Sequence, residues 1–434
     1  MIMKTKFLGA VALLASIFAM SACQKDKADD TWKQLPVEQI TVESGNAKLS
    51  VNEVPCTYGN VQFVAGGEDN AVLTLTGAVP GFSEVKVNVD LIKRGENTFH
   101  FSGSEVLSTP PSIAATLRSV ESSGFYTVAV EGDVTVEGTI SVGVTTYVSS
   151  AMTTSLKGSW NLVRKCQYGE TGPVNGPAQI TWKVAAEAGG NIATIVGLAN
   201  AIVCPLLTEV LNQVTFDESG NIMAQYYSNL DLGDDALSKI FELIGSVQPD
   251  AEGNVTYTAH HTDWLDSPKA NLAFWYAQES SLFIVPNIAA IINAADSEST
   301  RTDRTDLSGI DLSAIMELLS KLKEYGVDVD ALNTELQKIL TRGIELKYSE
   351  KDGGLKIYVD KALCAPIIEA LLPALKTLDV LLEELSKSED PEDQETLQTV
   401  QLVMYMLGLE KPSDLELVWK ATSEFEIALN FTKA

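Results

Sequence analysis

The sequence predicts an α+β protein with an N-terminal all-β sandwich or small barrel, followed by a larger α+β region of antiparallel hairpins packed with long apolar helices. Residues 45–152 consist of short segments with period-two alternation, separated by turn residues and with little helical spacing. Residues 153–434 alternate between apolar stretches of helical length and pairs of strands. With 434 residues and 45% apolar residues, the chain can bury more than one core.

Residues 1–22 have the three-part layout of a secretory signal peptide. Lys4 and Lys6 form a basic start, the apolar run Phe7–Met20 follows, and small residues precede Cys23. This run is shorter than the roughly 20 residues that span a bilayer. The segment Met20-Ser21-Ala22-Cys23 resembles a bacterial lipobox, in which Leu is usual where Met20 stands. The resemblance implies cleavage before Cys23 and acylation of this cysteine, with palmitate among the acyl chains.

Residues 23–44 are expected to form an acidic tether. Residues 24–30, with the sequence QKDKADD, resemble the surface-export signal of Bacteroidetes lipoproteins, and a plain solvated linker has the same composition. The two resemblances imply an outer-membrane lipoprotein, held by its N-terminal acyl chains, in the periplasm or, slightly favoured, on the cell surface. Three acyl chains give a stable anchor because each buried CH2 contributes about 0.8 kcal/mol.

The charge of the chain excludes some partners. The formal net charge is −27, and removal of the signal peptide with Lys4 and Lys6 leaves 29 basic against 58 acidic residues. Such a protein repels nucleic-acid phosphates and anionic lipid surfaces. We therefore expect no nucleic-acid partner.

The β-rich region, residues 45–152, contains six clear strand predictions. These fall at 61–64, 71–76, 83–91, 98–103, 125–130 and 134–148. Its last part, residues 128–142, resembles the calycin-like domains of uncharacterised Bacteroidetes lipoproteins. Residues 156–162 open the next region, and their Gly-x-Trp pattern around Trp160 resembles the first strand of lipocalin-like barrels. An ordinary strand with a packed Trp160 has the same pattern.

The α+β region, residues 153–434, is divided by a polar linker near 296–306. Helices are expected near 192–211, 234–246, 309–325, 328–340, 361–386 and 392–408. Strands are expected at 214–216, 222–227, 253–260, 271–277, 281–286, 344–348 and 355–359, with two more between Leu415 and Phe431. The helices around Cys204 and Cys364 share a Cys-Pro-apolar pattern, which leaves open whether the two helix–hairpin units are a duplication.

Two of the expected helices have almost no polar face. They cover residues 192–203 and 367–382. A helix that is apolar all round is buried, either in protein or along a cavity that holds lipid. This pattern favours a binding module for an apolar or amphipathic ligand, similar to tubular lipid-binding proteins in which a curved sheet wraps long helices around acyl chains.

Four cysteines remain after acylation of the first. They are Cys56, Cys166, Cys204 and Cys364. An even number in an oxidising compartment permits two disulfides in three pairings, and four buried free thiols are the alternative. Cys166 and Cys204 lie in one predicted domain and are the first choice for a pair.

No catalytic, metal or cofactor motif is present. The sequence lacks a Gly-x-Ser-x-Gly elbow, HExxH, a P-loop and a dinucleotide fingerprint. His260 and His261 are expected on a strand, where neighbouring side chains point to opposite faces, so they are not expected to bind one metal ion. We therefore expect a non-catalytic protein without a metal or cofactor, and a hydrolase is disfavoured.

Six tryptophans offer an alternative function, surface glycan binding or adhesion. Trp264, in a predicted loop between two strands, is the best candidate for an exposed ligand-contacting aromatic side chain. An exposed row of Trp side chains favours a glycan, whereas a closed apolar cavity favours a lipid.

Overall fold

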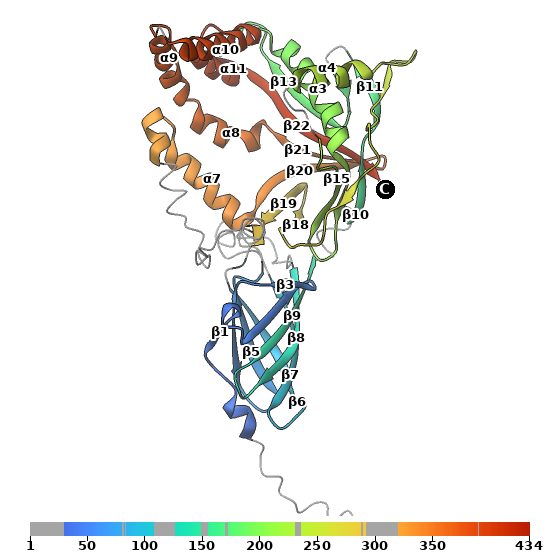
Figure 1. Ribbon diagram of the computed structural model, residues 1–434, viewed down its shortest axis with the longest axis vertical. Helices are drawn as coiled ribbons and strands as arrows, with labels where there is room; N and C mark the ends of the chain where they lie inside the picture. The colour runs from blue at the N-terminus through green and yellow to red at the C-terminus, as the bar shows by residue number, and fades with distance from the viewer. Residues whose placement is uncertain are drawn as a thin grey trace, which may run out of the picture.

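The computed structural model describes two lobes, each built on a curled sheet (Figure 1). It covers residues 30–79, 82, 84–107, 126–148, 155–169, 172–230, 236–287, 290, 291, 320–388 and 390–434. The predicted signal peptide, Cys23, the first part of the tether and the linker near 296–306 lie outside the described residues. The protein is 31% helical and 41% strand, which confirms the α+β class.

The first lobe is one nine-stranded sheet. Its order is β1-β4-β5-β6-β7-β8-β9-β2-β3, with antiparallel pairs throughout except for the parallel pair β2–β9. The strands are β1 (Gln39–Thr41), β2 (Ala47–Val51), β3 (Val54–Cys56), β4 (Asn60–Ala65), β5 (Asn70–Thr76), β6 (Glu84–Lys93), β7 (Thr98–Leu107), β8 (Tyr126–Thr135) and β9 (Ile140–Val148). Two 3-10 turns, η1 (Asp30–Gln34) and η2 (Val42–Ser44), precede β2.

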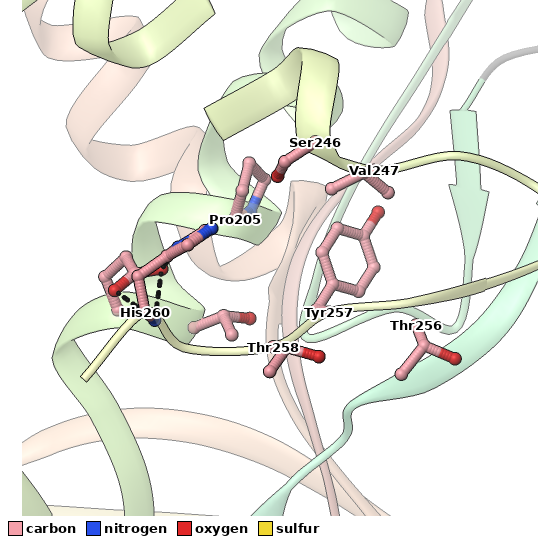
Figure 2. Close-up of a pocket in the computed structure, with 9 residues that line it drawn as sticks. Pro205, Ser246, Val247, Thr256, Tyr257, Thr258 and His260 are labelled. Carbon is pink, nitrogen blue, oxygen red and sulfur yellow. Dashed lines mark hydrogen bonds and ion pairs between the residues drawn. The ribbon is translucent and has the colours of Figure 1, made fainter. Parts of the chain in front are cut away.

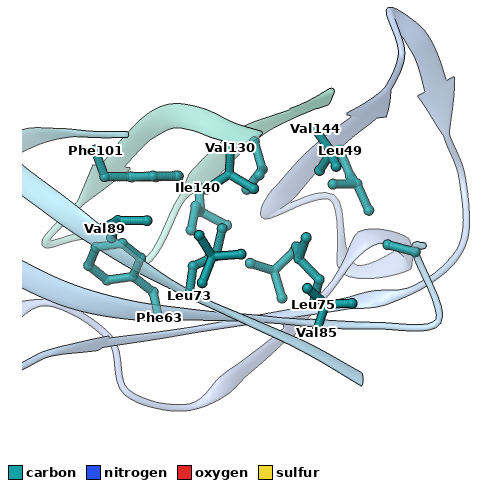
Figure 3. Close-up of a cluster of buried hydrophobic side chains, with 14 of the residues drawn as sticks. Leu49, Phe63, Leu73, Leu75, Val85, Val89, Phe101, Val130, Ile140 and Val144 are labelled. Atoms are coloured by element: carbon teal, nitrogen blue, oxygen red, sulfur yellow. The ribbon is translucent and has the colours of Figure 1, made fainter. Parts of the chain in front are cut away.

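Period-two alternation produces the core of this lobe. Along β6, Val85, Val87, Val89 and Leu91 are buried and the residues between them are exposed. Figure 3 shows side chains from β2, β4–β9 converging into the inside of the curled sheet. The sheet therefore curls around a core of packed side chains.

The second lobe contains a ten-stranded sheet and a three-stranded sheet. The large sheet has the order β17-β15-β14-β10-β22-β21-β20-β19-β18, with β13 also paired to β22, and the small one has the order β12-β11-β16. The strands are β10 (Gly158–Leu162), β11 (Lys165–Gly169), β12 (Gly172–Val174), β13 (Ala178–Val184), β14 (Leu211–Phe216), β15 (Ile222–Tyr226), β16 (Asn254–Thr256), β17 (Leu265–Asp266), β18 (Ala273–Gln278), β19 (Ser281–Pro286), β20 (Ile344–Lys351), β21 (Gly354–Asp360) and β22 (Thr422–Lys433). Trp160 on β10 is buried, and its Nε1 donates to the Leu156 carbonyl at 2.8 Å.

Helices lie beside this sheet (Figure 1). They are α3 (Ile192–Val210), α4 (Ala236–Ser246), α7 (Val329–Arg342), α8 (Lys361–Leu371), α9 (Ala374–Leu385), α10 (Pro391–Leu407) and α11 (Leu415–Lys420), with the 3-10 turns η4 (Lys323–Tyr325) and η5 (Pro412–Asp414). The tight turn of the predicted hairpin β20–β21 has positive φ at Asp352 and Gly353, as a type I′ turn requires.

Two predictions near the C-terminus were wrong. The single helix expected over 361–386 is two helices, α8 and α9, and the break falls at Leu372 and Pro373, where Pro disfavours a continuous helix. The two strands expected between Leu415 and Phe431 are the helix α11 and the single strand β22. The Asp414 carboxylate accepts hydrogen bonds from the backbone N–H groups of Glu410 and Lys411 in the turn before α11.

Helix α3 buries one row of side chains, at a spacing of four residues. The row consists of Ile192, Val196, Asn200, Cys204 and Thr208. The Asn200 side chain bonds both the N–H and the C=O of Ile180 on β13. By length and composition α3 is the one described helix that could cross a membrane; 39% of its apolar window is buried in the fold, and its polar residues Asn200, Thr208 and Glu209 are among the buried ones.

The expectation that apolar helices are buried was wrong for α8 and α9. Only Ala370 of α8 is buried, and no residue of α9 is. Ile367 and Leu371 on α8, and Val380 on α9, are at least 40% exposed. The apolar pattern of these segments therefore predicted that they are helical, but it did not predict that their side chains are exposed.

Buried amides join the two lobes. Asn52, just after β2, donates to the Asn271 Oδ1 of the second lobe at 3.1 Å. Asn271 Nδ2 donates to the Val51 carbonyl at 2.7 Å, and Thr146 Oγ1 donates to the Ser219 carbonyl at 2.6 Å. The four polar residues of this cluster are at most 5% exposed: Asn52, Thr146, Ser219 and Asn271.

Backbone conformation supports this junction. Asn52 and Asn271 both have positive φ, at 51° and 54°, which asparagine tolerates better than most residues. The Val148 N–H also donates to the Glu218 carbonyl at 2.9 Å. The lobes thus meet through hydrogen bonds that water cannot easily replace.

Candidate functional site

A polar pocket lies at the C-terminal end of α3 in the second lobe (Figure 2). Its volume is about 110 Å³. Its walls come from α3, the end of α4, β16 and the segment after β16. The lining residues are Pro205, Thr208, Glu209, Ser246, Val247, Thr256, Tyr257, Thr258 and His260.

Glu209 and His260 form a close pair in the pocket wall. Glu209 Oε1 lies 2.6 Å from His260 Nδ1, and the His260 backbone N–H lies 3.1 and 3.2 Å from the two carboxylate oxygens. The Glu209 side chain is 6% exposed, whereas the His260 side chain is 60% exposed. The carboxylate therefore fixes the position of an imidazole that remains open to solvent.

His261 has a different environment. Its ring stacks on Tyr227 with centroids 3.6 Å apart and lies 4.4 Å from the Trp264 ring. Its Nε2 lies 2.7 Å from the backbone oxygen of Glu209, so this nitrogen is the donor. His261 packs the loop against the end of α3.

Arg164 completes the end of α3. Its guanidinium donates at 2.8 Å to the carbonyl of Thr208, in the last turn of α3, and at 3.2 Å to the carbonyl of Leu211, the first residue of β14. Burial lowers the pKa of Arg164, and the nearby charge of Glu209 opposes this shift. The Arg164 charge also lies over the Trp264 ring, 5.6 Å from its centroid.

Trp264 is partly buried, with its ring near His261 and Arg164, and it does not line this pocket. Its role as a ligand-contacting side chain stays a prediction. The two histidines lie beyond β16, which ends at Thr256, but the alternation of exposed and less exposed residues continues to both of them. Both contact Glu209, His260 through the carboxylate and His261 through the backbone oxygen. Within the described part of the chain, no group of three or more His, Cys, Asp or Glu could hold a metal ion.

Sequence reasoning missed Glu209 and Arg164. Glu209 lies 51 residues from His260 in sequence, and nothing local signals that pairing. One available signal was the single acidic residue near the end of an otherwise apolar helix, because a buried carboxylate needs a partner.

Cys166 and Cys204 are free thiols that lie near each other behind the pocket. A Cβ placed on Gly176 would lie 3.4 Å from each of the two sulfur atoms. Burial raises the pKa of both thiols, that of Cys166 to about 11. Tyr257, which lines the pocket, packs in the same buried cluster as the two thiols.

The other two cysteines are distant in the fold. Cys56 is a free thiol in the core of the first lobe, and Cys364 is a free, partly buried thiol on α8. The disulfide between Cys166 and Cys204 remains a prediction.

A second feature of this lobe is an apolar sheet face that is only partly covered. The β-pairing places Ile180 and Val359 on either side of Ile427, and Ile357 beside Leu429. Ile427 is 44% exposed, and Ile344, on the neighbouring strand β20, is 43% exposed. We call this half-covered surface the apolar sheet face. It consists of Ile180, Ile344, Ile357, Val359, Ile427 and Leu429.

Exposed apolar side chains also gather on the helices of this lobe. They are Ile367 and Leu371 on α8, Leu378, Val380 and Leu381 on α9, and Leu402, Val403, Tyr405 and Met406 on α10. Single exposed apolar residues are normal, but gathered ones mark interaction sites in soluble proteins.

No protein-family model, curated protein or solved structure matches this chain.

Proposed function

We propose that the protein is a non-catalytic binding module of the cell envelope that takes an apolar or amphipathic, lipid-like ligand on its second lobe. The observation that carries this proposal is the apolar sheet face, which is apolar across β13, β22, β21 and β20 and yet leaves Ile344 and Ile427 more than 40% exposed. A ligand that covers these side chains gains about 25 cal/mol for each Å² of apolar area removed from water.

The exposed apolar residues of α8, α9 and α10 support the same proposal. Tyr405 is 79% exposed and Leu402 is 59% exposed, in a helix whose last turns carry no charge. Long side chains on such helices can adapt to an acyl chain without forming directional contacts. The acidic chain as a whole disfavours an anionic membrane surface as the occupant.

The proposal includes an anchor at the other end of the molecule. Acyl chains on Cys23 would attach the protein to the outer membrane, seven residues before η1. η1 lies at the end of the first lobe that is remote from the second lobe (Figure 1). The first lobe would then act as a spacer that holds the binding lobe away from the membrane, and the buried amides at the junction would keep that spacer stiff.

The glycan-binding alternative has less support at the residue first expected to carry it. The Trp264 ring lies 4.4 Å from the His261 ring, and the Arg164 guanidinium lies 5.6 Å from its centroid, so part of the ring is already in contact with protein. Packed aromatic rings stabilise a loop more often than they bind a ligand.

The test uses residues 24–434, which contain every described residue and lack the lipobox cysteine. N-phenyl-1-naphthylamine, a neutral apolar dye that fluoresces when bound, is titrated into this protein and into Ile427→Asp. We expect the substitution to weaken dye binding about tenfold, because it places a charge on the apolar sheet face. Native mass spectrometry of the same protein, purified without detergent, identifies any co-purified lipid.

The matched control is Ile92→Asp, an exposed Ile on β6 of the first lobe. It should leave dye binding unchanged. Equal dye affinity for wild type, Ile427→Asp and Ile344→Asp, together with a ligand-free mass, would exclude the apolar sheet face as a binding site.

A further inference from the structure

His260, which lines the pocket, and its neighbour His261, which does not, have different environments. His261 is 12% exposed, stacked on Tyr227 and bonded to the end of α3. His260 is anchored equally firmly through Glu209, yet 60% of its side chain is exposed. His260 satisfies the buried Glu209 carboxylate through its backbone N–H and Nδ1, and the rest of its imidazole remains open to solvent, where a ligand can reach it.

The Glu209 carboxylate determines which nitrogen of His260 is free. A carboxylate only accepts hydrogen bonds, so His260 Nδ1, 2.6 Å from Glu209 Oε1, carries a proton and donates it. In the neutral imidazole, Nε2 then has a lone pair and no hydrogen. His260 Nε2 has no partner among the described residues, so in the neutral imidazole it is available as an acceptor.

Two hydroxyl groups lie on the same side of the chain as His260. Thr256, Thr258 and His260 alternate with less exposed residues, and all three line the pocket (Figure 2). Neither threonine hydroxyl has a hydrogen-bond partner among the described residues. The pocket wall thus presents one acceptor and two groups that can both donate and accept.

The charges around the pocket select against ions. The buried Glu209 carboxylate repels an anion, and the guanidinium of Arg164 is already bonded to the end of α3. A cation would have to replace the hydrogen bonds that His260 makes to both carboxylate oxygens. The remaining class is a neutral ligand whose hydroxyl groups match the wall.

Size restricts the ligand further. A volume of about 110 Å³ is well below the roughly 300–1,000 Å³ of pockets that enclose drug-sized molecules. The pocket can take one small ring, or one ring at the end of a longer chain.

We propose that this pocket binds one sugar ring or a similar neutral polyol, with His260 Nε2 accepting a hydrogen bond from a ligand hydroxyl and Thr256 and Thr258 bonding its neighbours. This site uses none of the residues of the apolar sheet face, so it can exist whether or not that face binds a ligand. It also differs from the glycan contact first expected at Trp264.

The experiment is saturation-transfer difference NMR on residues 24–434. The probes are the methyl glycosides of glucose, galactose and mannose, with tetrahydropyran as the same ring without hydroxyls. We expect transfer to the ring protons of at least one glycoside and none to tetrahydropyran. His260→Ala should weaken binding of that glycoside about tenfold, the usual worth of one hydrogen bond with an exposed partner.

His260→Gln should restore part of the affinity, because its side-chain carbonyl can accept the same hydrogen bond. His100→Ala, a substitution in the first lobe, is the matched control and should bind as wild type does. Thr258→Val tests the same wall if His260→Ala proves unstable, and thermal melting reports the fold of each variant.

Two results would overturn the proposal. One is no transfer to any of the three glycosides. The other is a glycoside affinity that stays the same in His260→Ala and in Thr258→Val. Binding of N-phenyl-1-naphthylamine should not change in these variants, so failure here is distinct from failure of the apolar sheet face.

Discussion

The two lobes use apolar residues in similar proportion but bury them differently. In the first lobe the sheet curls onto itself, and Val61, Leu73 and Phe101 are at most 1% exposed. In the second lobe the larger sheet meets helices along only part of its face, and Ile427 keeps 44% of its surface exposed. A sheet that curls over its own side chains buries them without a partner, whereas a half-covered sheet leaves room for one.

This difference should appear most strongly in core truncations. Phe101→Ala in the first lobe removes a fully buried ring that packs on Phe63 with centroids 5.1 Å apart. We expect a loss of about 3–5 kcal/mol in the free energy of unfolding. Urea denaturation followed by circular dichroism measures it.

Ile427→Ala is the corresponding truncation in the second lobe and should cost less than about 1 kcal/mol, because its side chain is already half exposed. Equal losses for the two variants would mean that the face around Ile427 is as tightly packed in solution as the first core.

The junction between the lobes should show the next largest effect. Asn271→Ala removes the acceptor used by Asn52 and Asn221 and the donor to the Val51 carbonyl. Leaving these buried groups unpaired should cost about 3 kcal/mol. Differential scanning calorimetry should then resolve the melting of the two lobes as separate transitions. Asn229→Ala, an exposed Asn in the second lobe, should keep the wild-type melting profile.

A smaller effect on the free energy of unfolding should depend on pH. Burial raises the pKa of Asp217, but hydrogen bonds from Ser219 and Lys269 and the Lys269 charge outweigh it and hold the pKa below its ordinary value. A depressed carboxyl pKa stabilises the fold above the unfolded-state pKa of about 3.9, and the stabilisation is lost as pH falls through the folded-state value. Asp217→Asn should therefore cost about 1 kcal/mol at neutral pH.

The difference between wild type and Asp217→Asn should disappear on acidification. Thermal melting between neutral pH and pH about 3 checks it. A gap that stays constant over this range would assign the loss to altered packing near Trp275, whose Nε1 donates to the Asp217 carbonyl, instead of to the charge.

Local patterns predicted much of the fold. The alternation in β6 and the turn residues of the β20–β21 hairpin identified those elements, and the bounds predicted for β19 match the structure. The predictions failed where several local structures fit one pattern. The apolar stretch 361–386 is equally compatible with one helix or two, and the last segment fits a helix and a strand as well as two strands.

The candidate pocket could not be predicted from the sequence, for a different reason. The fold brings together Glu209, Arg164 and His260 from three separate segments of the chain. Within its own segment, none of these residues is part of a recognisable motif. Only the position of α3 against the segment after β16 reveals that the two histidines have different environments.

The sequence by itself determined the α+β class, the alternation that fills the first lobe and the absence of recognisable catalytic motifs, because these depend on residue type and short-range spacing. The tertiary structure decided which apolar surfaces are covered, how Asn52 meets Asn271 across 219 residues, and which histidine faces solvent. Those outcomes depend on long-range packing, where the partner of each side chain comes from another part of the chain.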